Sequence, residues 1–227
     1  MLPGNQATEL CSFLIDVCHE FGNFFFEGLL IKVEGVDIGA YLLVTCDGDN
    51  MDQLEELTEQ AAEVVLEAGA VDVLVADTPA KKKDAWAARS SFLEAIEAET
   101  KLLDECDVVV PVNQIAKYLT YVKGVSEKYD FAVKSFGHAG DGNVHLCVVR
   151  GDRDDATWAK ELDANLTVLY RKCTELGGLA SGEHGIGLSK QKHMLEAANP
   201  ANIALMKRVK AAFDEKGILN PGISYDA

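Results

Sequence analysis

Histidine, carboxylate and glycine are concentrated in two short stretches of this chain. GHAGDGNVH spans residues 137–145 and SGEHGIG spans residues 181–187, and together they hold three of the five histidines. Imidazole nitrogens and carboxylate oxygens are the usual ligands of a divalent metal ion. The glycines suit tight turns equally well, because they tolerate positive φ and let backbone segments approach closely. The two stretches therefore pose a choice between a metal site and a pair of turns.

The first stretch predicts a hairpin with a histidine on each side of its turn. Asp-Gly is a strong hairpin signal between the predicted strands 131–137 and 143–150. Hairpin arms bring facing residues close together, so His138 and His145 could converge on one ion. Taken alone, the stretch favours a glycine-rich hairpin whose histidines bond to backbone, because two histidines without further ligands are a weak metal signal.

The second stretch adds Glu183 and His184. Two histidines and one glutamate form a usual three-ligand set that leaves a coordination position open. If the backbone is extended at this point, Glu183 and His184 point to opposite sides, so that one binds the ion and the other faces a substrate. The alternative is a turn that leads into a helix. GEHGIG does not match the dinucleotide fingerprint G-x-G-x-x-G, and no strand runs directly into it.

A third candidate lies in AWAARS, residues 85–90. Trp86 and Arg89 are three residues apart on a predicted helix and share one face. In an acidic chain, an arginine beside an aromatic ring could bind a carboxylate through two hydrogen bonds. The alternative is a surface arginine stacked on a tryptophan.

The composition limits the classes of partner. The chain has 227 residues, is 48% hydrophobic and carries a net charge of −16, which disfavours nucleic acid. Its six cysteines form no CxxC pair, so we expect reduced thiols in a cytoplasmic protein. The first residues lack the pattern of a signal peptide, so we expect none, and no apolar run reaches ~20 residues; we therefore expect membrane contact only through a partner.

Strands and helices alternate along most of the sequence. We expect strands at 29–34, 40–46, 71–76, 107–112, 131–137 and 143–150. We expect helices at 7–20, 51–69, 78–99, 113–129 (with an Asn cap), 154–176, 189–197 and 200–216. This order predicts an α+β fold, with a largely antiparallel sheet covered by helices on one face and helices at the C-terminus.

Five sequence features in matching order resemble one family. They are the two motifs above, the Trp86/Arg89 pair, DVVVP at 107–111 and GILNPG at 217–222. They resemble the C-terminal half of the FAD-linked oxidases of D-2-hydroxy acids, over about residues 7–223. That group includes D-lactate dehydrogenases, D-2-hydroxyglutarate dehydrogenases and the flavin subunit of glycolate oxidase, within the vanillyl-alcohol-oxidase-like flavoproteins.

The resemblance implies a domain organisation and partners. Residues 1–227 would form a ferredoxin-like cap, or substrate, domain, and the FAD-binding domain would be absent from this chain. The partners would be a small 2-hydroxy acid, an FAD-binding domain or subunit, and an electron-acceptor protein or quinone; a homodimer is compatible with this organisation. The isolated chain would be inactive, because it has no electron acceptor.

The resemblance also implies roles for individual residues. His138, His145 and Glu183 would hold a divalent ion, zinc or manganese, that binds the hydroxyl and carboxylate of the substrate. His184 would be the general base, and Arg89 would clamp the substrate carboxylate.

Three positions depart from the family pattern. Relatives of the hydroxyglutarate type carry Thr and Lys where this chain has Leu93 and Glu105, and many members carry Asn where it has Cys147. The first two changes favour a short monocarboxylate such as lactate or glycolate over a dicarboxylate. Together with the expected absence of the flavin domain, these departures also leave open a stand-alone, non-catalytic module that scaffolds or regulates a partner. A metal-dependent hydrolase is a weaker third reading, because no nucleophile supports it.

Overall fold

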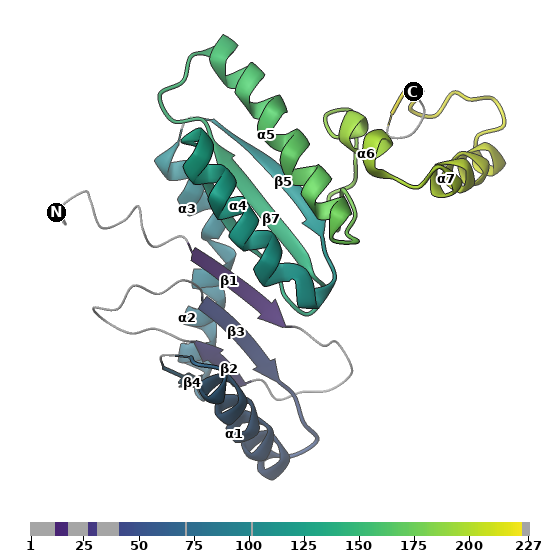
Figure 1. The fold of residues 1–227 in the computed structure, drawn as a ribbon. Helices are drawn as coiled ribbons and strands as arrows, with labels where there is room; N and C mark the ends of the chain where they lie inside the picture. Colours follow the sequence, from purple (N-terminus) through teal and green to yellow (C-terminus); the bar gives the residue numbers. More distant parts are fainter. Residues whose placement is uncertain (1–11, 18–26, 31–40, 71, 101, 224–227) are drawn as a thin grey trace. The chain divides into compact units, whose positions relative to one another are not determined.

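The computed structural model describes residues 12–17, 27–30, 41–70, 72–100 and 102–223. They belong to two compact units (Figure 1). The first unit contains the described residues up to Thr100 together with residues 134–140, and the second contains residues 102–133 and the described residues from Asp141 onward.

The first unit is built on a mixed sheet with strand order β4-β2-β3-β1-β6. Its strands are β1 (Ser12–Val17), β2 (Glu27–Leu30), β3 (Tyr41–Cys46), β4 (Leu74–Ala76) and β6 (Ala132–His138). β2 runs antiparallel to β3 and β4, whereas β1 runs parallel to β3 and β6.

The helix predicted at residues 7–20 is wrong in its described part, because Ser12–Val17 forms the strand β1. The run SFLIDV is short and apolar, and such a run is compatible with either a strand or a buried helix turn. This run forms a strand because β3 and β6 pair with its backbone, one on each side. Some predicted residues lie outside the described ones. They are the rest of the helix predicted at 7–20, residues 31–34 of the strand predicted at 29–34, and residue 71.

Three helices complete the first unit: α1 (Met51–Glu67), α2 (Pro79–Ser90) and α3 (Phe92–Glu99). The side chain of Thr78 caps α2, and Pro79 occupies its first turn as predicted. The single helix expected at 78–99 is instead two helices that meet at Ser91. The Ser91 hydroxyl donates to carbonyls of the preceding turn, which competes with continuation of the helix.

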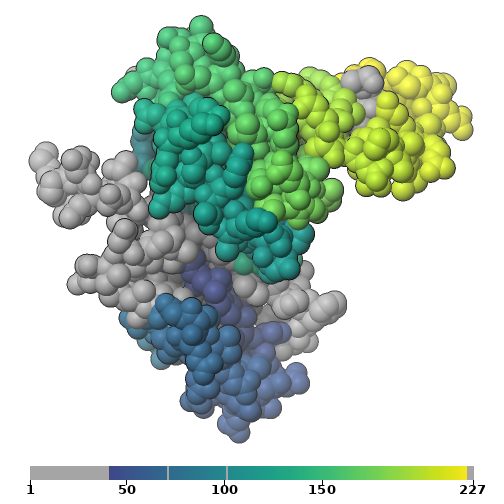
Figure 2. All heavy atoms as spheres, in the orientation of Figure 1, coloured from purple at the N-terminus to yellow at the C-terminus, as the bar shows by residue number. Residues whose placement is uncertain are grey.

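The second unit is a two-stranded antiparallel ladder covered by helices. Its elements are β5 (Leu103–Val109), the 3₁₀ turn η1 (Val112–Gln114), α4 (Ile115–Tyr129), β7 (Asn143–Val149), α5 (Asp155–Glu175), α6 (Gln191–Ala197) and α7 (Pro200–Phe213). The helices α4 and α5 lie over the ladder (Figure 1) and side by side on the surface (Figure 2). The Asn cap predicted for α4 is wrong: the 3₁₀ turn precedes the helix, and Gln114 is the capping residue without a side-chain bond.

The two faces of the β5–β7 ladder differ in chemistry. One face carries Cys106 and Val108 opposite Leu146 and Val144, all fully buried, and forms the core. Because successive strand residues point to opposite faces, the other face carries Glu105 and Asp107 of β5. β5 begins four residues earlier than predicted, which brings Glu105 into the strand.

The expected fold class is confirmed. The described chain is α+β, its pairings are antiparallel except for those of β1, and it ends in helices.

Candidate metal and substrate site

The polar face of the β5–β7 ladder places a carboxylate opposite a histidine. Asp107 of β5 pairs directly with His145 of β7 in the antiparallel register. Both are buried: Asp107 is 0% exposed and His145 is 3% exposed. The Oδ1 atom of Asp107 lies 3.7 Å from Nδ1 of His145. A buried carboxylate beside an imidazole nitrogen is an arrangement that orients histidine ligands of metal ions.

The other oxygen of Asp107 holds the SGEHGIG loop. Oδ2 accepts hydrogen bonds from the Ser181 hydroxyl (2.8 Å) and from the backbone N–H groups of Gly182 (3.0 Å), Glu183 (3.0 Å) and His184 (2.8 Å). Burial pushes the pKa of Asp107 upward, but these bonds outweigh it and leave the pKa below its ordinary value. One carboxylate oxygen of Asp107 therefore holds the SGEHGIG loop in place.

Glu183 and His184 do not point to opposite sides, so that expectation is wrong. Glu183 Oε1 lies 3.0 Å from Nε2 of His145. The His184 ring stacks on the His145 ring, with centroids 4.8 Å apart and an interplanar angle of 21°. Extended backbone would separate the two side chains, but three consecutive N–H groups converge on Asp107 and bend the chain here.

Glu105 also belongs to this cluster. Its Oε1 lies 3.7 Å from Nδ1 of His145, and its Oε2 lies 3.7 Å from Nδ1 of His184. Burial raises the pKa of Glu105, while His184 opposes that rise. Sequence reasoning identified Glu105 only as a departure from the family. Its spacing of two residues from Asp107 was the signal, but the predicted strand began too late to use it.

The loop approaches the ladder as closely as a glycine allows. A Cβ atom on Gly182 would lie 2.5 Å from the side-chain nitrogen of Asn143, which is itself buried. This position therefore requires glycine for space rather than for a special φ.

The first unit brings together the other two predicted site residues. Nη2 of Arg89, in the last turn of α2, lies 3.1 Å from Nε2 of His138, at the end of β6. Arginine can only donate, so Nε2 of His138 is the acceptor. Trp86 packs against the buried cluster of Leu43 and Ala85 and thus fixes the helix that carries Arg89.

The donor set of the second unit fits a divalent cation. His145 Nε2 and Glu183 Oε1 face each other at 3.0 Å, and His184 Nε2 lies 3.8 Å from the same oxygen. Glu105, His145 and His184 offer a second set of ligand atoms, all within 4.8 Å of one another. Imidazole nitrogen and carboxylate oxygen suit zinc or manganese.

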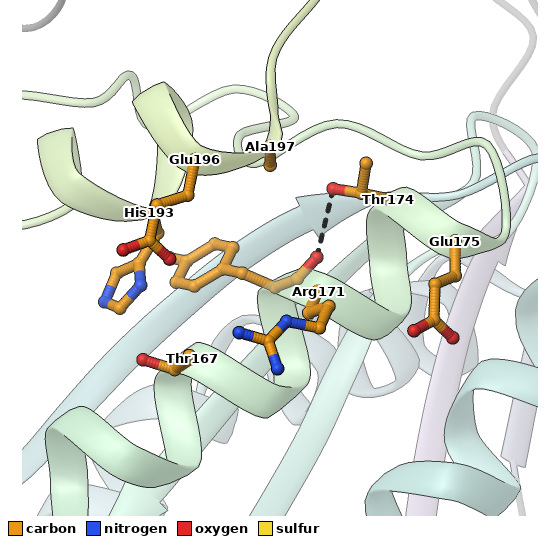
Figure 3. A pocket seen from close by; sticks show the side chains of 8 residues that line it. Thr167, Arg171, Thr174, Glu175, His193, Glu196 and Ala197 are labelled. Carbon is orange, nitrogen blue, oxygen red and sulfur yellow. Dashed lines mark hydrogen bonds between the residues drawn. The ribbon is translucent and has the colours of Figure 1, made fainter.

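A separate hollow of about 210 Å³ lies between α5 and α6 (Figure 3). It is lined by Thr167, Tyr170, Arg171, Thr174, Glu175, His193, Glu196 and Ala197. His193 is buried and stacks on Tyr170, with ring centroids 4.8 Å apart. Since burial lowers the pKa of His193, we interpret it as a neutral core histidine.

The four described cysteines are free thiols, as expected. Burial raises the pKa of Cys106 and of Cys173 to about 12, so neither is a thiolate at neutral pH. Cys147 is buried opposite Glu105, so a thiol stands beside the cluster where many relatives carry Asn.

Comparison with known proteins agrees with these features. The family model described as FAD linked oxidases, C-terminal domain, matches residues 17–223. The chain belongs to this family. Within the FAD-linked oxidase family it is 56% identical over 191 residues to a D-lactate dehydrogenase of Anaerostipes hadrus, which covers 84% of this chain and 40% of that protein.

Two further relatives widen the range of named substrates. The chain is 34% identical over 187 residues to glycolate oxidase subunit GlcD of Escherichia coli K12 (82% of this chain, 37% of that protein). It is 31% identical over 217 residues to a D-2-hydroxyglutarate dehydrogenase of Stutzerimonas stutzeri (90% and 46%). The chain thus spans less than half the length of these relatives. Within its described portion, we find no helix with the length and hydropathy of a membrane span.

Proposed function

We propose that this chain is the substrate-binding and metal-binding part of a flavin-dependent dehydrogenase that oxidises a small D-2-hydroxy acid to the 2-oxo acid. The observation that carries the proposal is the cluster in which Nε2 of His145 faces Glu183 at 3.0 Å while the ring of His184 stacks on His145. The family to which the chain belongs supports the FAD-linked chemistry.

In this proposal His138, His145 and Glu183 hold one divalent ion. His138 would join the other two across the turn 139–142, which links β6 to β7 along the chain. A bound zinc or manganese ion would supply positive charge that lowers the pKa of a coordinated hydroxyl. Asp107 would hold the ligand loop in place through its four hydrogen bonds.

His184 is the proposed general base, and Arg89 is the proposed carboxylate clamp. The ring of His184 is stacked against a ligand histidine, within reach of a hydroxyl held beside His145. Arg89 already meets His138 at 3.1 Å. An ion bound at Nε2 of His138 would displace this bond, because that nitrogen has a single lone pair, and would release the guanidinium for the substrate carboxylate.

The proposed oxidation removes two protons and two electrons from the 2-hydroxy acid. The hydroxyl proton goes to His184, and the α-hydrogen leaves with its electron pair. A flavin, held mainly by a separate FAD-binding domain or subunit, would accept that pair. This part of the proposal draws on the curated relatives, in which the matched segment makes up 37 to 46% of the protein.

The proposed substrate is a short monocarboxylate of the lactate or glycolate type. The carboxylate of Glu105 lies beside the two imidazoles and would repel a second carboxylate of the substrate. Leu93 offers no polar group to such a carboxylate. The D-lactate dehydrogenase relative at 56% identity is consistent with this choice.

Metal titration of the purified chain tests the proposal. We expect one divalent ion per chain by calorimetry with zinc or manganese, and no binding after His138→Ala or His145→Ala. His193→Gln is the matched control, because His193 lies in the separate hollow between α5 and α6. A chain that binds no ion at neutral pH would contradict the metal assignment and favour the alternative, a non-catalytic module that regulates a partner. The three departures at Leu93, Glu105 and Cys147 are what keep that alternative open.

A further inference from the structure

Apolar side chains gather on the surface of α7 and the turn that follows it. Six large ones, which we call the α7 face, are 38 to 84% exposed: Leu205, Met206, Val209, Phe213, Ile218 and Leu219. Leu205, Val209 and Phe213 are spaced four residues apart and therefore share one side of the helix. None of the 14 residues of α7 is buried. A helix of this length is marginal in water without tertiary packing, so we expect the α7 face to be covered.

Ile218 and Leu219 are held in place by a buried carboxylate. Asp214, which is 8% exposed, accepts hydrogen bonds from the backbone N–H groups of Ile218 (2.9 Å) and Leu219 (3.0 Å) and from Nζ of Lys210 (2.7 Å). A hollow of about 360 Å³ beside this turn is lined in part by Phe213 and Leu219. The turn thus presents its apolar side chains in a fixed arrangement, which lowers the entropic cost of docking a partner.

The α7 face is continuous with the SGEHGIG loop. A larger hollow, of about 560 Å³, is lined in part by Asn202 and Met206 of α7 and by Ser181 and Ile186 of the loop. Ser181 also donates to Asp107, which anchors the loop beside the histidine cluster. A partner that covers the α7 face therefore also reaches the edge of the candidate site.

We propose that the α7 face is the docking surface for the flavin-binding part of the protein. The inference rests on the proposed function, in which the α-hydrogen and its electron pair pass to a flavin held mainly outside this chain. Such a transfer requires contact, so the flavin-binding part must cover a surface that adjoins the loop. The matched segment makes up 37 to 46% of the curated relatives, so more than half of each relative is available to cover it. Permanent interfaces of this kind are rich in apolar side chains.

A second copy of the chain fits the α7 face less well. The helix α7 carries Lys207, Arg208 and Lys210 and no acidic residue. A two-fold symmetric contact through α7 would bring these like charges together. A different partner surface is free of this repulsion.

The test measures whether the α7 face is covered in a complete enzyme. This chain replaces the C-terminal domain of the D-lactate dehydrogenase relative to which it is 56% identical, and the chimera is compared with the isolated chain. Val209→Cys places a thiol on the α7 face. Its reaction with a maleimide is followed by mass spectrometry, which distinguishes it from the six native cysteines. We expect this thiol to react at least about tenfold more slowly in the FAD-loaded chimera than in the isolated chain, because docking excludes solvent from it.

Val112→Cys is the matched control. Val112 belongs to the same unit and is 56% exposed, against 51% for Val209. We expect its thiol to react equally fast in both proteins. If the chimera does not fold, the flavin-binding part of the relative, purified with FAD, is added to the isolated chain and the same rates are compared.

The outcomes separate the docking surface from the proposed function. Equal rates for Val209→Cys in both proteins would overturn the docking surface, even if the chimera oxidises D-lactate. Slow reaction in the isolated chain, together with a dimer in analytical ultracentrifugation, would assign the α7 face to a second copy and overturn the inference too. Protection of Val209→Cys in a chimera that holds FAD but oxidises no 2-hydroxy acid would support the docking surface and contradict the proposed function.

Discussion

Arg89 donates a hydrogen bond to His138, and the two residues come from motifs separated by nearly fifty positions in the chain. The contact joins the predicted carboxylate clamp to a predicted metal ligand inside the first unit. An ion at Nε2 of His138 and the guanidinium of Arg89 exclude each other there, since one lone pair cannot serve both.

This exclusion predicts the behaviour of Arg89→Gln. We expect the variant to raise KM for the 2-hydroxy acid at least about tenfold, since a bidentate, charge-assisted contact is lost. Metal affinity should not fall, because a competitor for His138 is removed. Steady-state kinetics of the chain combined with its flavin-binding part, and metal titration of the chain alone, give the two readouts. Lys82→Gln on the same helix is the control for loss of positive charge. Loss of metal affinity in Arg89→Gln would contradict the competition.

The substrate range should respond to Glu105→Lys combined with Leu93→Thr. Lysine and threonine are the residues of the hydroxyglutarate-type pattern at these positions. We expect kcat/KM for D-2-hydroxyglutarate to rise at least about tenfold and kcat/KM for D-lactate to fall, because a cation replaces the carboxylate beside His184. Glu105→Gln, which removes the charge without adding a cation, serves as the comparison. Equal changes for both substrates would argue against a role of position 105 in substrate size.

Gly182→Ala should displace the ligand loop. A methyl group at this position would meet Asn143 at 2.5 Å, so the loop or the buried amide must move, and we expect a loss of about 1–3 kcal/mol in unfolding free energy. Gly124→Ala is the control, because nothing lies within 4 Å of the added methyl in α4. That substitution should stabilise the chain by about 0.5–1 kcal/mol. Urea unfolding of both variants tests the contrast, and similar effects in the two would contradict the close approach of the loop.

The chain should lose stability in mild acid through His193. Burial lowers the pKa of His193, with Asp163 opposing the shift and Lys192 adding to it. The unfolded chain therefore binds more protons below about pH 6.5 than the folded chain, and folding weakens as pH falls through that range. His193→Phe keeps a ring against Tyr170 and removes the titration. The melting temperature of the variant should fall less between pH 7.5 and pH 5.5 than that of the wild type. If the melting temperatures of the variant and the wild type fall equally between these pH values, groups other than His193 cause the acid sensitivity.

The sequence predicted most elements of the second unit, because its amphipathic helices and apolar strands follow regular periods. It failed at Ser12–Val17, where a short apolar run carries no period and pairing between strands decides the outcome. It also missed Asp107 as an anchor, since four donors from residues 181–184 converge on it only in three dimensions. The role of Glu105 was hidden for a related reason: it depends on which residues face each other across the ladder, and that register cannot be derived from periodicity.

The hydrogen bonds between the SGEHGIG loop and Asp107 affect which residues of such a site can be substituted during evolution. Three of its four attachments are backbone N–H groups, which nearly every amino acid supplies. The side chains of residues 183 and 184 can therefore change without breaking these backbone bonds, whereas Gly182 must stay small and the single acceptor on β5 has no substitute within the loop. Side chains that face the site can therefore differ between related proteins, whereas the carboxylate of Asp107 must be kept.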